Sequence, residues 1–104
     1  MYQLNFSGKP IAGTHEIALN VDYLLQEDIV LEVARAVDEV RDEILDAKRN
    51  GEPVVLVLPD NGVMAVSIFQ AVRGLLGNRV PFIRGANTEA IDTEDIREAF
   101  RDSL

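Results

Sequence analysis

The first segment that could do chemistry consists of Ser7, Gly8 and Lys9, which follow one another directly. They offer a hydroxyl group, a backbone that a ligand can approach closely and a cation. This combination suits a phosphate group. Taken alone, the same three residues also describe an ordinary turn with a solvated lysine, and both interpretations stay open at this point.

A second candidate segment covers residues 59–62, Pro59, Asp60, Asn61 and Gly62, directly before a helical pattern. The backbone amides at the start of that helix, together with the helix dipole, would bind an anion without a basic side chain. Asp60 or Asn61 could equally be a simple helix cap. Arg84 ends a later apolar run, where it could contact a phosphate or form a salt bridge to an acidic helix.

Sequence motifs of the common nucleotide-binding and hydrolytic sites do not occur. There is no GxGxxG after the first apolar run, no GxxxxGK[ST], no HExxH and no GxSxG. Cysteine is absent, and the single histidine, His15, has no obvious acidic or nucleophilic catalytic partner in the sequence, which favours a structural or solvated role. We therefore expect no cofactor and no metal, and no catalytic residue can be named.

The charge is unevenly distributed along the chain. The 104 residues include 18 acidic and 10 basic side chains, a net charge of −8. Residues 27–52 hold nine acidic and four basic side chains, and residues 89–102 hold six and two, so the rest of the chain has a net charge of +1. This composition excludes broad affinity for long nucleic acid, but it leaves the candidate loops free to face an anion.

The length predicts one domain over residues 1–104. No apolar run approaches the ~20 residues of a membrane span and no signal peptide is recognisable, so we expect a soluble, cytoplasmic protein. Apolar patterns predict strands at 2–6, 16–21, 53–58 and 80–84 and helices at 27–49, 63–76 and 93–104.

Strands that alternate with helices predict an α/β fold, a three-layer sandwich around a mainly parallel sheet. The run at 53–58 lacks alternation, which is typical of a central strand covered on both faces. Ligands of such sheets bind at the carboxyl ends of the strands, so the three candidate segments should gather at one edge. The helix at 63–76 is apolar all round and therefore needs cover on more than one side, which predicts a homodimer through this helix.

Three stretches, LNFSGKP, GEPVVLVLP and AVSIFQAVRGLLGNRVPFIR, resemble the plan of small accessory proteins of type III CRISPR antiviral defence systems. The resemblance covers roughly residues 1–84. It implies a CRISPR-associated Rossmann-like fold and binding of a cyclic oligoadenylate second messenger, chiefly cyclic tetra-adenylate. The ligand loops of that family match residues 5–9 and 59–62 here, which adds two positions to the candidate site. The complete candidate site is Asn5, Phe6, Ser7, Gly8, Lys9, Pro59, Asp60, Asn61, Gly62 and Arg84.

Members of that family either cleave the ring, as metal-independent ring nucleases, or sequester it as sponges. A two-fold dimer could place its axis through the symmetric ring and offer each loop twice. The sequence supplies no clear general base for cleavage, which favours sequestration that damps CRISPR signalling. Two alternatives remain besides ring cleavage: an acidic adaptor that docks a basic partner through residues 27–49, and a small-molecule enzyme on the same scaffold.

Overall fold

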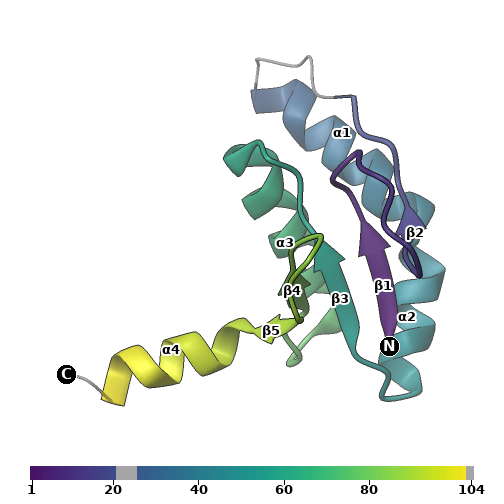
Figure 1. The fold of residues 1–104 in the computed structure, drawn as a ribbon. Helices are drawn as coiled ribbons and strands as arrows, with labels where there is room; N and C mark the ends of the chain where they lie inside the picture. Colours follow the sequence, from purple (N-terminus) through teal and green to yellow (C-terminus); the bar gives the residue numbers. More distant parts are fainter. Residues whose placement is uncertain (21–25, 103–104) are drawn as a thin grey trace.

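A computed structural model describes residues 1–20 and 26–102, and these form an α/β fold with a five-stranded, mostly parallel sheet (Figure 1). The strands are β1 (Tyr2–Asn5), β2 (His15–Glu16), β3 (Val54–Val57), β4 (Phe82–Arg84) and β5 (Ile91–Asp92). The helices are α1 (Gln26–Glu39), α2 (Arg41–Arg49), α3 (Gly62–Leu76) and α4 (Thr93–Asp102).

The sheet has the strand order β2-β1-β3-β4-β5, and only the pairing of β4 with β5 is antiparallel. The strand predicted as central, β3, lies between β1 and β4 and is buried along its whole length. Because β1, β3 and β4 are parallel neighbours, their carboxyl ends share one edge of the sheet. The segments that follow these strands therefore meet at that edge, as the sequence predicted.

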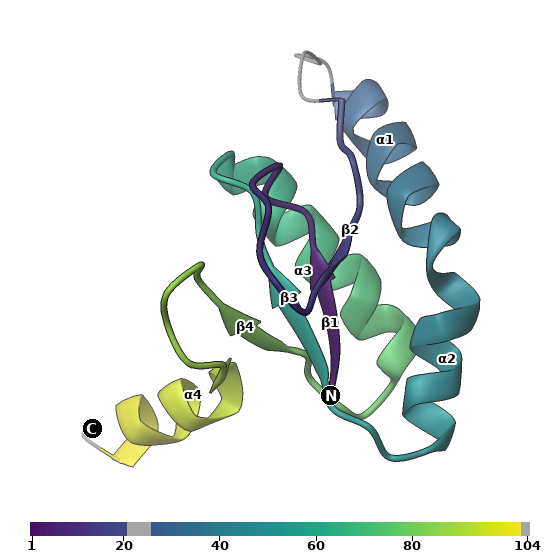
Figure 2. The same ribbon diagram turned by 45° about the vertical axis from the view of Figure 1, so that its right-hand side comes forward.

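The helices cover one face of the sheet and not both. Helices α1 and α2 both pack against α3, and the core between these helices and the sheet contains Leu4, Leu56 and Ile68 (Figure 2). Helix α4 contacts β5 and projects away from the body, with none of its described residues buried. The expected three-layer sandwich is therefore wrong for the single chain, whose described residues form two layers.

The second face of β3 is covered by side chains of the neighbouring strands. Val55 and Val57 lie on this face and are almost completely buried. In the sheet register Gln3 lies beside Val55, and Arg84 lies beside Val57 on the other side. The Arg84 side chain reaches across β3 and donates from Nη1 to Gln3 Oε1 at 2.7 Å. The sequence therefore correctly predicted that β3 is buried on both faces. On the face without helices, however, the side chains of Arg84 and Gln3 help to cover the strand.

Three expected element boundaries need correction. The helix predicted at 27–49 is divided at Val40, whose backbone amide donates to the Val37 carbonyl oxygen at 3.1 Å, one residue nearer than in an α-helix. In place of the strand predicted at 16–21 the structure has the two-residue strand β2 at His15–Glu16. Residue 21 of the predicted strand lies outside the described residues. Strand β5 lies where a loop was expected. No helix among the described residues has both the length and the apolarity to cross a membrane.

Candidate anion-binding cleft at the carboxyl edge of the sheet

The loop after β1 is fixed by the side chain of Asn5, which is buried. Its Oδ1 accepts hydrogen bonds from the Ser7 backbone amide at 2.9 Å and from the Ser7 hydroxyl at 2.6 Å. Its Nδ2 donates to the Lys9 carbonyl oxygen at 2.7 Å. This arrangement is an Asx turn closed at both ends by one side chain. Asn5 therefore positions the loop, and its polar atoms are occupied by the loop itself.

The same loop shows what Ser7 and Gly8 contribute. The Ser7 hydroxyl also accepts from the Lys9 backbone amide at 3.2 Å, so it is engaged on both sides within the turn. Gly8 has a positive φ of 77°, a conformation in which a side chain would be strained. Phe6, the neighbouring residue, is buried in the core. Lys9 is the residue whose charged group extends from this loop.

The turn after β3 forms a capped helix N-terminus. The Asn61 side chain accepts from the Met64 backbone amide at 3.1 Å, and the Asn61 carbonyl oxygen accepts from the Ala65 amide at 2.9 Å. An α-helix has no internal partners for its first amides, so those of Gly62 and Val63 remain as donors at this end. Asn61 is thus a helix cap, and the cap leaves two amides directed toward the edge of the sheet.

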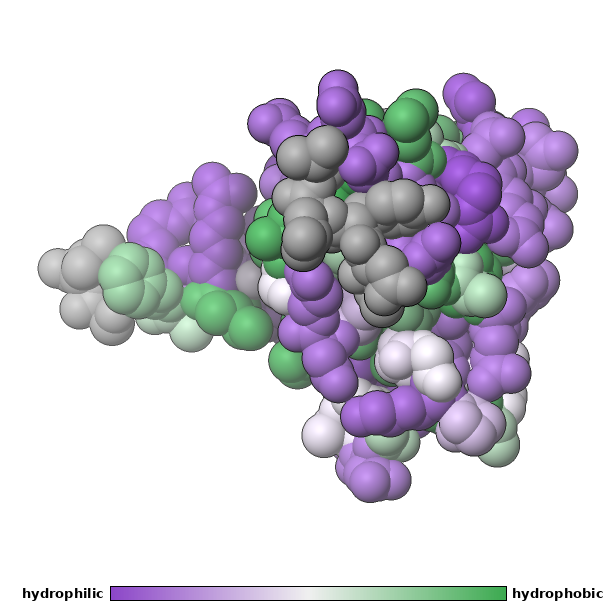
Figure 3. Space-filling view, turned by 90° about the horizontal axis from the view of Figure 1, so that it is seen from above, coloured by the Kyte–Doolittle hydropathy of each residue, from purple (hydrophilic) through white to green (hydrophobic). Residues whose placement is uncertain are grey.

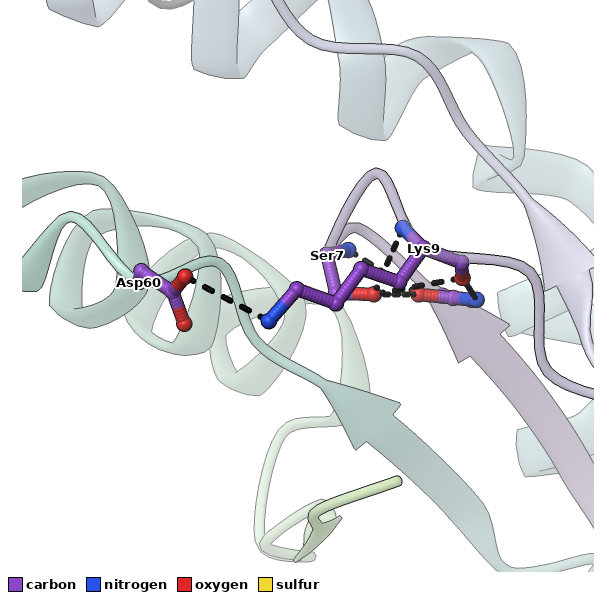
Figure 4. Close-up of polar contacts among 4 residues, drawn as sticks. Ser7, Lys9 and Asp60 are labelled. Carbon is purple, nitrogen blue, oxygen red and sulfur yellow. Dashed lines mark hydrogen bonds and ion pairs between the residues drawn. The ribbon is translucent and has the colours of Figure 1, made fainter.

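These two segments enclose a cavity of about 350 Å³. Its lining includes Ser7, Gly8, Pro59, Asp60 and Asn61, together with Phe6 and Leu19. Lys9 Nζ lies 3.7 Å from Asp60 Oδ2 across the gap, and Figure 4 shows the lysine side chain extending from the β1 loop toward the start of α3. Both side chains are largely exposed, at 66% for Lys9 and 91% for Asp60. The structure therefore brings the first two candidate segments together around one hollow.

Arg84 lies at the same edge but does not line this cavity. Besides its bond to Gln3, its Nε donates to the Gly85 carbonyl oxygen at 3.0 Å and its Nη2 to the Ala86 carbonyl oxygen at 3.1 Å. All three nitrogens of the guanidinium group thus have partners in the chain. Two of the five guanidinium N–H groups are left for a ligand, and the other three hold the Arg84 side chain in place.

A wall of the cavity is held by a charged pair that sequence reasoning did not identify. Leu19 lines the cavity, and the residues on either side of it are tied to α1: the Asn20 amide donates to Glu32 Oε2, and Arg35 Nη2 donates to the Ala18 carbonyl oxygen at 2.8 Å. Arg35 Nε donates to the buried Glu32 carboxylate at 2.6 Å. This hydrogen bond, assisted by the bond from Asn20, lowers the pKa of Glu32 although burial acts in the opposite direction. Glu32 and Arg35 are three residues apart in the predicted helix, and this spacing was the signal in the sequence that could have indicated the pair.

The chemistry available at this edge is that of anion binding. Lys9 and Gly62 do not line the cavity themselves, but Lys9 Nζ pairs with Asp60, which does, and the Asp60 carboxylate partly neutralises this cation. His15 is exposed on β2 and does not line the cavity. The described residues contain no group of three or more side chains that could hold a metal ion. Seen from above this edge, hydrophobic residues form separate patches among polar ones (Figure 3).

Comparison of the chain with protein-family models, with curated proteins and with solved structures found no match.

Proposed function

We propose that this protein binds a phosphate-bearing ligand in the cleft between the β1 loop and the start of α3, and that the ligand is cyclic tetra-adenylate. The observation that carries the proposal is the position of Lys9, whose Nζ lies 3.7 Å from Oδ2 of Asp60, a residue that lines the cavity just before the α3 N-terminus. Phosphate is the ligand that a lysine and the free amides of a helix N-terminus together favour. The choice of a cyclic oligoadenylate comes from the resemblance of LNFSGKP and the two later stretches.

A homodimer through α3 is part of this proposal. The helix directs Met64, Ile68, Val72 and Leu76 into the core of its own chain. Val63 and Val66 point outward and are 59% and 64% exposed, whereas Gln70 and Arg73 continue the same side with polar groups. The uncovered apolar surface is thus confined to the first two turns, next to the cleft. Contact between two copies there would bring two clefts together around a two-fold axis, as a symmetric ring ligand requires.

Sequestration is favoured over cleavage of the ring. Cleavage would need a group that activates the ribose 2′-hydroxyl in line with the adjacent phosphate. The Ser7 hydroxyl is engaged with Asn5, and His15 lies outside the cavity. Lys9 and the helix amides can bind the ligand and stabilise its negative charge, but they do not activate the ribose hydroxyl. These roles match a protein that sequesters the ring without cleaving it.

The test uses the purified full chain and labelled cyclic tri-, tetra- and hexa-adenylate. We expect the protein to retain cyclic tetra-adenylate and to release it intact after long incubation, as judged by chromatography of the recovered ligand. Linear fragments would instead identify a ring nuclease. Failure to retain any of the rings at low ionic strength, where charge interactions are strongest, would contradict the proposal.

The alternative of a protein-interaction adaptor gains support from a different part of the chain than the sequence indicated. Helix α4 exposes Ile96 and Phe100, at 55% and 66%, on an element that buries none of its described residues. The adaptor would become the better supported function under two conditions. The chain would retain no nucleotide, and Phe100→Ser would abolish the capture of a defined partner protein by the full chain.

A further inference from the structure

A second cavity lies at the opposite edge of the sheet, where the parallel strands begin. It has a volume of about 550 Å³ and lies between the carboxyl end of α3, the start of β4 and the first turn of α4. Leu76, Val80 and Phe82 give it an apolar wall. This size is within the range of cavities that hold small ligands, and most of the remaining lining is polar.

Three arginines from three separate elements line this cavity: Arg73 of α3, Arg79 of the following turn and Arg97 of α4. Arg97 Nη1 pairs with Glu94 at 3.7 Å. Arg79 donates to the carbonyl oxygens of Lys48 and Glu52, at 3.5 and 3.3 Å, and has no carboxylate partner among the described residues. The Arg73 side chain makes neither a hydrogen bond nor an ion pair with any residue in the described part of the chain. Within the described part of the chain, the guanidinium groups of Arg73 and Arg79 therefore have no carboxylate partner.

The carboxylates of the same cavity do not supply that counter-charge. Asp92 Oδ1 accepts from the Glu94 backbone amide at 3.0 Å and so caps the start of α4, while the Glu94 side chain pairs with Arg97. Across the chain acidic side chains exceed basic ones by eight. Arg73 is exposed and Arg79 is held by two backbone carbonyl oxygens, so the wall of this cavity offers two guanidinium groups that suit an anion from outside the chain.

We propose that this second cavity binds a small phosphate monoester with an apolar or aromatic group, its phosphate held by Arg73 and Arg79 and its apolar part against Phe82. Guanidinium groups bind phosphate through paired, charge-assisted hydrogen bonds, which makes phosphate the anion that two arginines recognise best. The site is independent of the cleft at the carboxyl edge, because the two cavities share no lining residue. Either proposal can therefore fail without the other.

The competing explanation is that these arginines only stabilise the carboxyl end of α3, where positive charge interacts favourably with the helix dipole. The two explanations differ in a binding experiment. Phenyl phosphate, inorganic phosphate and phenol are titrated into the isotope-labelled full chain, and backbone amide shifts are recorded by NMR, at low and at physiological salt. The binding proposal expects saturable shifts at Gly77, Asn78 and Phe82, with phenyl phosphate binding more tightly than either of its two halves.

Arg73→Gln is the main variant, because the Arg73 side chain supports no other described residue. We expect it to weaken phenyl phosphate binding about tenfold, the usual effect of losing one charge-assisted hydrogen bond. Arg101→Gln is the matched control, since it removes the same charge from α4 at a position outside the cavity. Absence of saturable shifts, or equal weakening by Arg73→Gln and Arg101→Gln, would overturn the proposal.

Discussion

The pairing of Lys9 with Asp60 predicts opposite effects of two substitutions on ligand binding. A phosphate that reaches Lys9 must displace Asp60 or lie beside it, because the two charged groups are only 3.7 Å apart. Exposed ion pairs contribute about 0–1 kcal/mol, so the displacement costs little. We therefore expect Lys9→Gln to weaken binding of cyclic tetra-adenylate and Asp60→Asn to strengthen it.

The size of both effects follows from the distance. Two unit charges about 4 Å apart in water interact by about 1 kcal/mol, which corresponds to about a fivefold change in affinity. Asp60→Asn removes a repulsion of this size between the carboxylate and a phosphate seated at Lys9. Lys9→Gln removes an attraction of similar size. Both effects should shrink at higher salt, since both groups are exposed and screened.

Isothermal titration calorimetry with the wild type, both single variants and the double variant measures these effects. Asp38→Asn is a close control, because Asp38 forms an equally long, exposed pair with Arg41, at 3.7 Å, outside the lining of the cleft. This control makes the same change in net charge and should leave affinity almost unchanged. Weaker binding by Asp60→Asn would refute the reasoning, because it would mean that Asp60 contacts the ligand directly.

Two further predictions concern groups that hold the fold. Glu32→Gln should lower the free energy of unfolding at neutral pH by about 1 kcal/mol. The pKa of Glu32 is lowered in the folded chain, so the contribution of the Glu32 carboxylate to stability is complete above the ordinary carboxyl pKa of about 4.3 and is lost as the pH falls further. Urea unfolding at several pH values should therefore show the stabilities of the wild type and Glu32→Gln converging in acid. A difference in stability that does not change with pH would contradict this. Tyr2→Phe should leave stability unchanged or raise it by about 1 kcal/mol, because the buried Tyr2 hydroxyl has no hydrogen-bond partner within residues 1–20 and 26–102. Burial, assisted by Glu43 and Glu52, raises the pKa of Tyr2 to about 12, so Tyr2 ionisation leaves the wild type's stability unaffected below about pH 10 and lowers it as the pH rises from there through 12. An ultraviolet titration should show a late tyrosinate component in the wild type that is missing in Tyr2→Phe, and an ordinary midpoint for that component would refute the assignment.

Local patterns in the sequence were sufficient to predict three of the parallel strands, β1, β3 and β4, and the meeting of the loops that follow them. The run at 53–58 and the helical pattern at 63–76 correspond to β3 and α3, because β-branched residues and a capped helix start are determined within a few residues. The edge shared by the loops then follows from the parallel order of strands. The cavity between residues 7–9 and 59–62 is a direct consequence of these two predictions.

The helix break and the number of layers could not be predicted in the same way. Val40 continues the apolar period of the predicted helix at 27–49, and it is fully buried, so periodicity gives no sign of the break there. The number of layers depends on whether α4 packs against the face of the sheet that the other helices leave open. The sequence of α4 is strongly amphipathic and predicts a covered face, yet Ile96 and Phe100 stay more than half exposed and none of the described residues of α4 is buried.

The side chain of Arg84 connects the fold to the proposed site. Sequence reasoning placed Arg84 among the ligand-binding residues because it ends a strand at the correct edge. In the folded chain it crosses β3 to Gln3, a partner 81 positions away in the sequence, and this covers Val57 on the face that lacks a helix. A residue so distant in sequence gives no local signal. Because Arg84 already has a structural role, the cleft proposed here relies on Lys9 and the α3 amides for its positive potential, and the strength of ligand binding depends on whether Asp60 leaves Lys9 free.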